Sequence, residues 1–402
     1  MNTMPLKNFA TPETMLRRSE LYGLLDALCH EIELTDAQFE AAKANYTAVG
    51  NWLAGSEHES LKKLNIYVHG STALGTTVKP IGRDEHDVDL ICHVPGFSPT
   101  RPPSELKTLI GDRLRENAKY AAILEEKKRC WRLNYARQFH LDISPTVPNP
   151  ACMNGGELVP DKKLRDWKAT NPTGYRDLFR RRASLTPKLR MLKRMVAADA
   201  QAEIEPFPAK RSHKGILRRT VQLLKRHRDI AFMMIEADVA PISVIITTLA
   251  SQAYEFCVGR FEFDTEFDVV IATIRMMPHF IERPVVGGKK LWVVTNETTN
   301  GENFAERWNS EPERAHAFYN WHQQALEDFE RFANLEGVDR LTTEIGKSLG
   351  TRDVRAVFDG RTREISEARS AMKLFVAPTI GLTVSQTARA SQVLRNTNFG
   401  DR

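Results

Sequence analysis

The sequence predicts an α+β fold, in which a small mixed sheet with flanking helices is followed by a mostly helical second lobe. Short runs of alternating apolar residues, typical of strands, occur at residues 64–69, 87–94, 128–135 and 138–144. After a segment rich in Pro, Gly and Asn at residues 145–173, apolar residues recur at helical spacing. A chain of 402 residues is longer than one hydrophobic core usually organises, which favours two lobes.

The first 150 residues are predicted to form the sheet together with two N-terminal helices. Leu21, Leu24 and Leu28 lie at helical spacing in the first helix, a second follows at residues 36–53, and both are expected to brace the sheet. A Pro-rich loop at residues 95–103 and a helix at residues 105–117 separate the second strand from the third. We place the lobe boundary after residue 150 and interpret residues 145–173 as a loop-rich connection.

Residues 151–385 are assigned to the second lobe, which is expected to close over a cleft. Its helices are predicted at residues 179–198, 214–236, 241–256 and 311–335. The last of these carries an apolar stripe that we interpret as core: Phe318, His322, Ala325, Phe329 and Phe332. The polar residues 386–402 are expected to form a mobile tail, and a frayed end is favoured there over a docking role.

Composition and charge narrow the class of protein. The 57 basic and 51 acidic side chains leave a net charge of +6, which suits anionic ligands without separating nucleotides from nucleic acids. The five cysteines are scattered singly, so neither a disulfide framework nor a zinc ribbon is indicated. No apolar run is long enough for export or for a membrane span. We expect a cytoplasmic protein with no membrane partner.

Three aspartates form the most informative chemical pattern. Asp87 and Asp89 lie two residues apart in one predicted strand, so both side chains point to one face while Val88 faces the core. Asp142 lies on the polar face of the strand at residues 138–144, and it joins the pair if the two strands are neighbours. Mg²⁺ prefers oxygen ligands and is usually held by a few carboxylates together with substrate phosphates. The pattern therefore predicts a metal site that acts on a phosphate-bearing substrate.

Gly70 and Ser71 supply a predicted phosphate-binding turn before the paired acids. Gly70 permits a tight turn after the first strand, and Ser71 lies where a helix begins, with its hydroxyl and nearby N–H groups available to phosphate oxygens. The order of strand, Gly-Ser turn, short helix, Asp-x-Asp strand and later Asp-bearing strand resembles the nucleotidyltransferase superfamily of polymerase-beta type.

Two residues of the predicted second lobe are candidates for contacts with phosphates. Lys225 is four residues from Val221 in a predicted helix, so it can emerge into the cleft, where fixed positive charge stabilises phosphoryl transfer. The alternative is a solvated helix face shared with Arg226 and Arg228. Ser243 lies in the first turn of the next predicted helix, another position that suits a phosphate.

These two helical segments, together with Trp167 and residues 171–175, resemble the bacterial CD-NTases, which are related to cyclic GMP-AMP synthase and oligoadenylate synthase. The resemblance covers about residues 64–250. It implies donor-phosphate contacts through the Gly-Ser turn, two Mg²⁺ ions bound by the three aspartates, and triphosphate contacts from the second lobe. The implied residues are Gly70, Ser71, Asp87, Asp89, Asp142, Lys225 and Ser243.

The resemblance also implies an activity and its partners. Such an enzyme joins NTPs, with ATP expected among them, into a cyclic di- or trinucleotide second messenger and releases pyrophosphate. A separate effector protein then reads the product, antiviral defence is the implied setting, and a regulatory partner is compatible with it.

Other activities compatible with the three acids remain open at this point. A template-independent RNA-tailing enzyme needs a basic track, whereas this chain has only local basic clusters and no signature of an RNA-binding module, so no stable nucleic-acid partner is expected. An enzyme that nucleotidylates a small molecule or a protein seldom needs so large a helical lobe. A non-catalytic nucleotide sensor has no need of all three aspartates.

Overall fold

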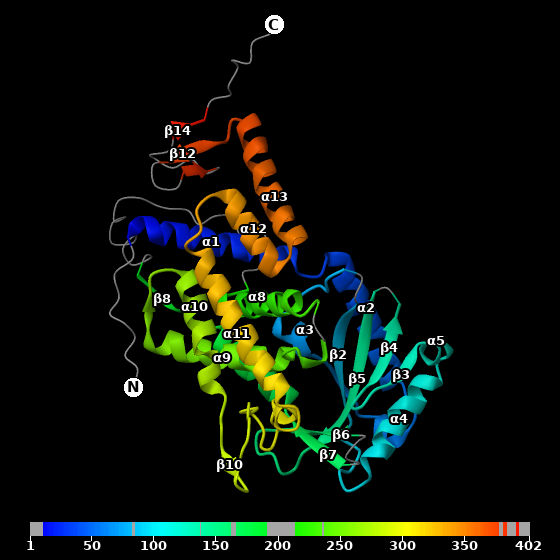
Figure 1. The fold of residues 1–402 in the computed structure, drawn as a ribbon. Coiled ribbons are helices and arrows are strands. Elements are labelled where there is room, and N and C mark those ends of the chain that lie inside the picture. The colour runs from blue at the N-terminus through cyan, green and yellow to red at the C-terminus, as the bar shows by residue number, and fades with distance from the viewer. Residues whose placement is uncertain are drawn as a thin grey trace.

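The computed structural model describes residues 11–82, 85–136, 138–161, 166–190, 214–234, 237–377, 381–383 and 391–393. A twisted mixed sheet lies beside a larger body of helices (Figure 1). The predicted α+β class, with a sheet core and a mostly helical second part, is confirmed.

The main sheet brings strands from distant parts of the chain together. Five of its strands run in the spatial order β1 (Asn65–His69), β2 (His86–His93), β5 (Phe139–Pro148), β4 (Trp131–Tyr135) and β3 (Leu124–Glu126). Strands β2 and β5 are parallel, and the other neighbouring pairs in this order are antiparallel. The two Asp-bearing strands are therefore direct neighbours, which is the condition under which Asp142 was expected to join Asp87 and Asp89.

Two further strands occupy the segment that was expected to be a loop-rich connection. β6 (Glu157–Asp161) pairs with the end of β5, and β7 (Asp166–Thr170) pairs with β6. The expectation of a loop throughout residues 145–173 is therefore wrong. The turn-forming residues concentrate in the loop between β5 and β6, where Gly155 has a positive φ of 71°. On either side of that loop, pairing with β5 outweighs the turn propensity of the local prolines.

One face of the sheet is covered by two helices, α2 (Asp36–Ala54) and α4 (Pro103–Arg115) (Figure 1). Leu53 and Ile110 from these helices pack in one buried cluster with Leu90 and Leu141 of the central strands. Helix α2 begins at a complete capping box formed by Thr35 and Gln38. The opposite face of β2 and β5 is left to the polar side chains of the site.

The helical body contains helices from both ends of the chain. Its main members are α1 (Pro12–Glu31), α6 (Pro172–Ala183), α8 (Ile216–Ala231), α9 (Ser243–Arg260), α10 (Glu266–Met276), α11 (Glu313–Phe332) and α12 (Val338–Leu349). Leu25 and Leu28 of α1 are fully buried in the same cluster as Leu223 of α8. The prediction that both N-terminal helices brace the sheet is thus right for α2 and wrong for α1, because an apolar stripe specifies burial but not the partner.

Two expectations for helices of the second lobe have clear outcomes. The apolar stripe of α11 is buried as predicted, with Phe318 and Phe329 fully inaccessible. The helix expected at residues 179–198 ends early, because α6 stops at Ala183 with Ser184 as its C-cap, and Pro187 follows shortly after. Residues 191–198 lie outside the described residues.

The C-terminal part forms a small projecting unit (Figure 1). Helix α13 (Thr351–Ser370) leads into a three-stranded sheet of β12 (Phe375–Ala377), β13 (Gly381–Thr383) and β14 (Ser391–Gln392). β14 pairs with β12, so this part of the expected tail at residues 386–402 is a strand, and only residues 391–393 of that tail are described.

The remaining elements are short. They are α3 (Gly70–Leu74), α5 (Ala118–Ala121), β8 (Lys188–Leu189), β9 (Glu262–Phe263), β10 (Val285–Val286), β11 (Lys289–Lys290) and the 3₁₀ helices at Glu59–Leu61, Ala237–Val239, Met277–Phe280 and Glu306–Asn309. None of the helices in the described ranges combines the length and the apolar character needed to cross a bilayer.

Candidate active site

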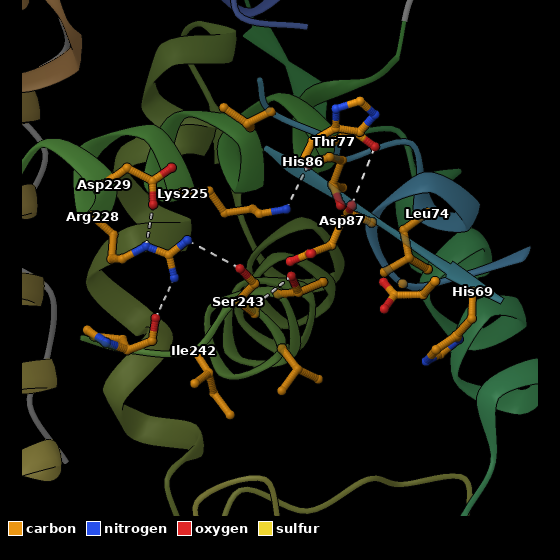
Figure 2. A pocket seen from close by; sticks show the side chains of 18 of the residues that line it. His69, Leu74, Thr77, His86, Asp87, Lys225, Arg228, Asp229, Ile242 and Ser243 are labelled. Atoms are coloured by element: carbon orange, nitrogen blue, oxygen red, sulfur yellow. Dashed lines mark hydrogen bonds and ion pairs between the residues drawn. The ribbon is translucent and has the colours of Figure 1, made fainter. Parts of the chain in front are cut away.

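A cavity of about 990 Å³ lies between the polar face of the sheet and the helical body. One wall comes from the end of β1, helix α3 and strand β2, and the facing wall comes from α8 and the start of α9. Figure 2 shows Lys225, Arg228 and Ser243 on one side of this space, with Asp87 and His69 on the other. Its volume is at the upper end of the range for small-molecule sites.

The three predicted aspartates lie close together beside the cavity, which Asp87 and Asp89 line directly. Asp89 of β2 lies directly opposite Asp142 of β5 in the parallel register. Asp142 in turn lies opposite Arg132 of β4, whose guanidinium donates to both carboxylate oxygens at 2.7 Å and to Oδ1 of Asp87 at 3.1 Å. Val88 is 3% exposed on the other side of β2. The alternation that predicted a shared face is therefore correct for all three acids.

The charges of the three aspartates are only partly compensated. Burial, reinforced by Asp142 and Asp87, raises the pKa of Asp89 from its ordinary 3.8 to about 6. Burial also raises the pKa of Asp87, although the Arg132 guanidinium opposes this. The hydrogen bonds to Asp142 raise the pKa of Arg132. Adjacent carboxylates that resist ionisation in this way form an environment that favours an additional cation.

Arg132 was not identified from the sequence. It alternates with the buried Trp131 and Leu133 along β4, so its place on the polar face beside Asp142 could have been found once β4 and β5 were paired. No group of three His, Cys, Asp or Glu side chains within the described ranges is arranged to hold a metal ion. In the present conformation Arg132 binds the oxygens of Asp87 and Asp142 that the predicted metal site requires.

Gly70 is needed at its position for two independent reasons. Its φ is +60°, a conformation that side chains with a Cβ rarely adopt. A Cβ built on Gly70 would also overlap the Asp89 carboxylate. Ser71 follows in the first turn of α3, lines the cavity, and accepts a long hydrogen bond of 3.5 Å from the Thr77 hydroxyl. The predicted turn is therefore present and packs directly against Asp89.

Lys225 emerges into the cavity as predicted. Its side chain is largely buried, and its Nζ donates to the carbonyl oxygen of Thr76 at 3.0 Å. Burial, with a contribution from Arg228, lowers the pKa of Lys225 to about 8, while Asp229 and Asp89 oppose the change. The alternative of a solvated helix face is wrong, because Arg226 is only 1% exposed.

Ser243 is the first residue of α9, and Arg228 connects it to the end of α8. The Arg228 guanidinium donates to Ser243 Oγ at 3.2 Å, to Asp229 Oδ1 at 2.7 Å and to the carbonyl oxygen of Pro241 (Figure 2). Arg228 lines the cavity together with Lys225, one helical turn away. Both predicted second-lobe residues thus reach the site, and Arg228, which belonged only to the alternative of a solvated helix face, joins them as a cation lining the cavity.

His69 is a further lining residue that sequence reasoning missed. It ends β1 directly opposite Asp89, and burial lowers its pKa to about 4, so the ring is neutral near pH 7. Its position beside an acid in the antiparallel register follows only from strand pairing, which the sequence did not reveal.

Both the sequence and the structure are similar to those of known proteins. Residues 22–182 match the Second Messenger Oligonucleotide or Dinucleotide Synthetase domain. A c-di-GMP synthase from Roseivirga ehrenbergii is 28% identical over 396 residues, covering 96% of this chain and 98% of that protein. The cyclic dinucleotide synthase CdnG from Bradyrhizobium diazoefficiens is 26% identical, with 95% of each chain covered.

Solved structures share the fold. The Bradyrhizobium diazoefficiens CD-NTase CdnG in complex with GTP superposes with a TM-score of 0.62 at 21% identity, over 86% of this chain and 99% of that one. The CdnC:HORMA-deltaN complex from E. coli MS115-1 gives a TM-score of 0.54 at 15% identity, over 84% and 96% of the two chains. The predicted polymerase-beta-type nucleotidyltransferase core with a helical second lobe is thereby confirmed. The chain is therefore similar in sequence to bacterial cyclic dinucleotide synthases and in fold to CD-NTases, and it is a nucleotidyltransferase.

Proposed function

We propose that this enzyme joins two nucleoside triphosphates into a cyclic dinucleotide and releases pyrophosphate at each of its two bond-forming steps. The observation that carries the proposal is the row of Asp89, Asp142 and Arg132 across three strands, with Asp89 and Lys225 both lining the cavity of about 990 Å³. Acids on one wall and cations on the other are the arrangement that in-line phosphoryl transfer requires. The names of both relatives, a c-di-GMP synthase and a cyclic dinucleotide synthase, support a dinucleotide product over a trinucleotide.

The acid cluster fits a divalent cation. Its donors are hard carboxylate oxygens, and burial, reinforced by Asp142, raises the pKa values of Asp89 and Asp87, so that a bound cation would favour their ionised forms. We assign two Mg²⁺ ions to Asp87, Asp89 and Asp142, which the Arg132 guanidinium must release in part. Bound ions of this kind activate an acceptor hydroxyl and stabilise charge on the departing pyrophosphate.

The chain's own residues bind and orient the substrates in this proposal. Lys225 and Arg228 neutralise the donor triphosphate, while the hydroxyls of Ser71 and Ser243 donate to its phosphate oxygens. The acceptor hydroxyl oxygen attacks the α-phosphorus, the bond to the bridging oxygen breaks, and pyrophosphate leaves. Asp142 orients this hydroxyl and takes its proton. The second step repeats the reaction after the linear intermediate has turned within the cavity.

The two lobes have different roles in the proposed reaction. We assign the acids to the sheet core, which extends past residue 150 through β6 and β7, and the closing of the cleft to the helical body, which also includes α1. The structures of CdnG with GTP and of CdnC with HORMA-deltaN support GTP as one substrate and leave room for a regulatory partner. ATP is the expected alternative or second substrate. We further propose that a separate effector reads the product in antiviral defence against phage.

Incubation of the purified protein with all four NTPs and Mg²⁺, followed by mass spectrometry, tests the proposal. A phosphatase-resistant cyclic dinucleotide supports it, and a ladder of polymer supports the alternative, RNA tailing. Asp87→Ala is expected to abolish product formation with the fold intact, whereas Asp112→Ala, an exposed acid on α4, serves as the matched control. Substantial product from Asp87→Ala would remove the assignment of the acid cluster.

A further inference from the structure

A carboxylate outside the acid cluster also lines the cavity. Glu302 reaches this space from the loop between Asn296 and Phe304, beside Thr170 at the end of β7 and Tyr175 of α6. The proposed mechanism gives Glu302 no role. Because a carboxylate repels phosphate groups, a nucleotide placed in this cavity would keep its triphosphate away from Glu302 and turn another part of itself toward it.

Glu302 is held in a defined orientation by a buried amide. Nδ2 of Asn296 donates to Oε2 of Glu302 at 2.7 Å, and the Asn296 backbone N–H donates to the Glu302 carbonyl oxygen at 3.0 Å. Asn296 is only 2% exposed, and its own Oδ1 accepts from the N–H and the hydroxyl of Thr298. These bonds fix which end of the Asn296 amide faces the carboxylate. The acceptor is therefore preorganised at the cavity wall.

The charges and hydrogen bonds around Glu302 leave its carboxylate able to accept further hydrogen bonds. Burial raises the pKa of Glu302, against the effect of hydrogen bonds from Asn296 and Thr170. The basic groups nearby, Arg129 and Lys168, are paired with other acids, Asp161 and Glu306. A carboxylate offers about four lone-pair sites on two oxygens, so acceptor capacity remains for a ligand that donates hydrogen bonds.

Among the common bases, guanine matches such an acceptor. Its Watson–Crick edge presents two neighbouring donors, N1–H and the N2 amino group, which pair with the two oxygens of one carboxylate. Adenine and cytosine each place an unprotonated ring nitrogen beside their amino group, and its lone pair would face the carboxylate. Uracil has one N–H between two carbonyl oxygens. The ring of Phe304 lines the same cavity, and aromatic side chains commonly stack on bases.

We propose that Glu302 selects guanine by accepting hydrogen bonds from N1–H and the N2 amino group of a bound GTP. This inference rests on the proposed function, because it names the base that the same cavity takes. Glu302 is a specificity-determining residue in this assignment and takes no part in the chemistry at phosphorus.

The test compares GTP with ITP, which lacks only the N2 amino group, and with ATP, for both binding affinity and kcat/KM. The wild-type enzyme is expected to prefer GTP over both analogues. Glu302→Gln should lower kcat/KM and affinity for GTP by roughly 10- to 100-fold, the value of a bidentate base contact. In the variant, Asn296 holds the amide oxygen, so the amide N–H₂ faces the ligand. The GTP-to-ITP ratio should fall toward one, and ATP should gain relative to GTP.

Glu306→Gln is the matched control, because Glu306 lies four residues later, is exposed and pairs with Lys168 outside the cavity. It should keep the wild-type ratios. Glu302→Asp retains the carboxylate and should recover part of the GTP preference, which separates recognition from misfolding. An unchanged GTP-to-ITP ratio in Glu302→Gln overturns the inference. Absence of a cyclic product from the wild-type enzyme would instead sink the proposed function, while the binding ratios still decide the role of Glu302.

Discussion

Asp89→Asn should stabilise the metal-free protein at alkaline pH while it removes activity. Burial, reinforced by the neighbouring Asp142 and Asp87, raises the pKa of Asp89 in the folded protein from the ordinary 3.8 to about 6. The folded state therefore holds the proton more tightly than the unfolded state, so ionisation of Asp89 costs folding free energy. The penalty is absent below pH 4, develops between about pH 4 and 6, and is complete above that range.

The size of this effect follows from the change in pKa. The pKa of Asp89 rises by about two units, and each unit corresponds to about 1.4 kcal/mol, so ionisation of Asp89 lowers the free energy of unfolding by at most about 3 kcal/mol. Asp89→Asn keeps the shape of the side chain and removes the charge, so it should recover this amount at pH 8 and very little at pH 4. For a lobe of this size, about 2 °C per kcal/mol gives a rise of about 6 °C in the midpoint of thermal unfolding.

The assay is thermal unfolding in EDTA at pH 4, 5, 6 and 8, with Asp112→Asn as the control on the exposed surface of α4. Saturating Mg²⁺ with GTP should make the wild type more thermally stable than Asp89→Asn, since ligand binding stabilises only the wild type. Equal or lower stability of Asp89→Asn at pH 8 in EDTA would show that burial beside Asp87 and Asp142 does not destabilise ionised Asp89, and the electrostatic basis of the proposed metal site would fail.

Three further changes test the other walls of the site. Gly70→Ala would place a Cβ at a residue with positive φ and against the Asp89 carboxylate, so it should lower the unfolding free energy by about 1–2 kcal/mol and kcat by about 100-fold. A near-normal kcat would contradict the close approach of Gly70 to Asp89. In the wild type, the affinity for GTP should fall as the pH rises through about 8, because Lys225 loses its proton there. Lys225→Met should weaken GTP binding and abolish this pH dependence of the affinity. Titration calorimetry at pH 6.5 and 9 measures both affinities. Arg132→Met should tighten Mn²⁺ binding by about 10-fold or more, because the ion no longer displaces a charge-assisted hydrogen bond from Asp142; weaker binding in paramagnetic titrations would mean that Arg132 supports the ion site.

The sequence was sufficient to predict the acid wall of the site because strand periodicity is local. Alternation at Asp87 and Asp89 determines a shared face whatever the partner strand is, and the same holds for Asp142. Lys225 and Ser243 were found through helical spacing and a helix start, with the family resemblance deciding between alternatives. In each case, the local pattern carried the geometric information.

The residues that were missed depend on contacts between distant segments. Arg132 and His69 became visible only when the register placed them beside Asp142 and Asp89. Glu302 lies in an irregular loop, where no periodicity indicates which side chains face a cavity. The strands β6 and β7 were misread for the same reason, since pairing with the end of β5 outweighed local Pro and Gly. Sequence patterns reveal faces of elements, and packing decides which faces meet.

The placement of α1 has a consequence for dissecting the protein into fragments. Leu25 and Leu28 near the start of the chain pack against helices that begin only after residue 215, whereas α2, a few residues later, belongs to the sheet. A fragment that ends at residue 150 would expose the apolar face of α1, and the complementary fragment would expose the apolar surface that α1 covers in the whole protein. The two halves are interlocked along the sequence, so co-expression of both pieces, not either alone, is the way to obtain a split enzyme.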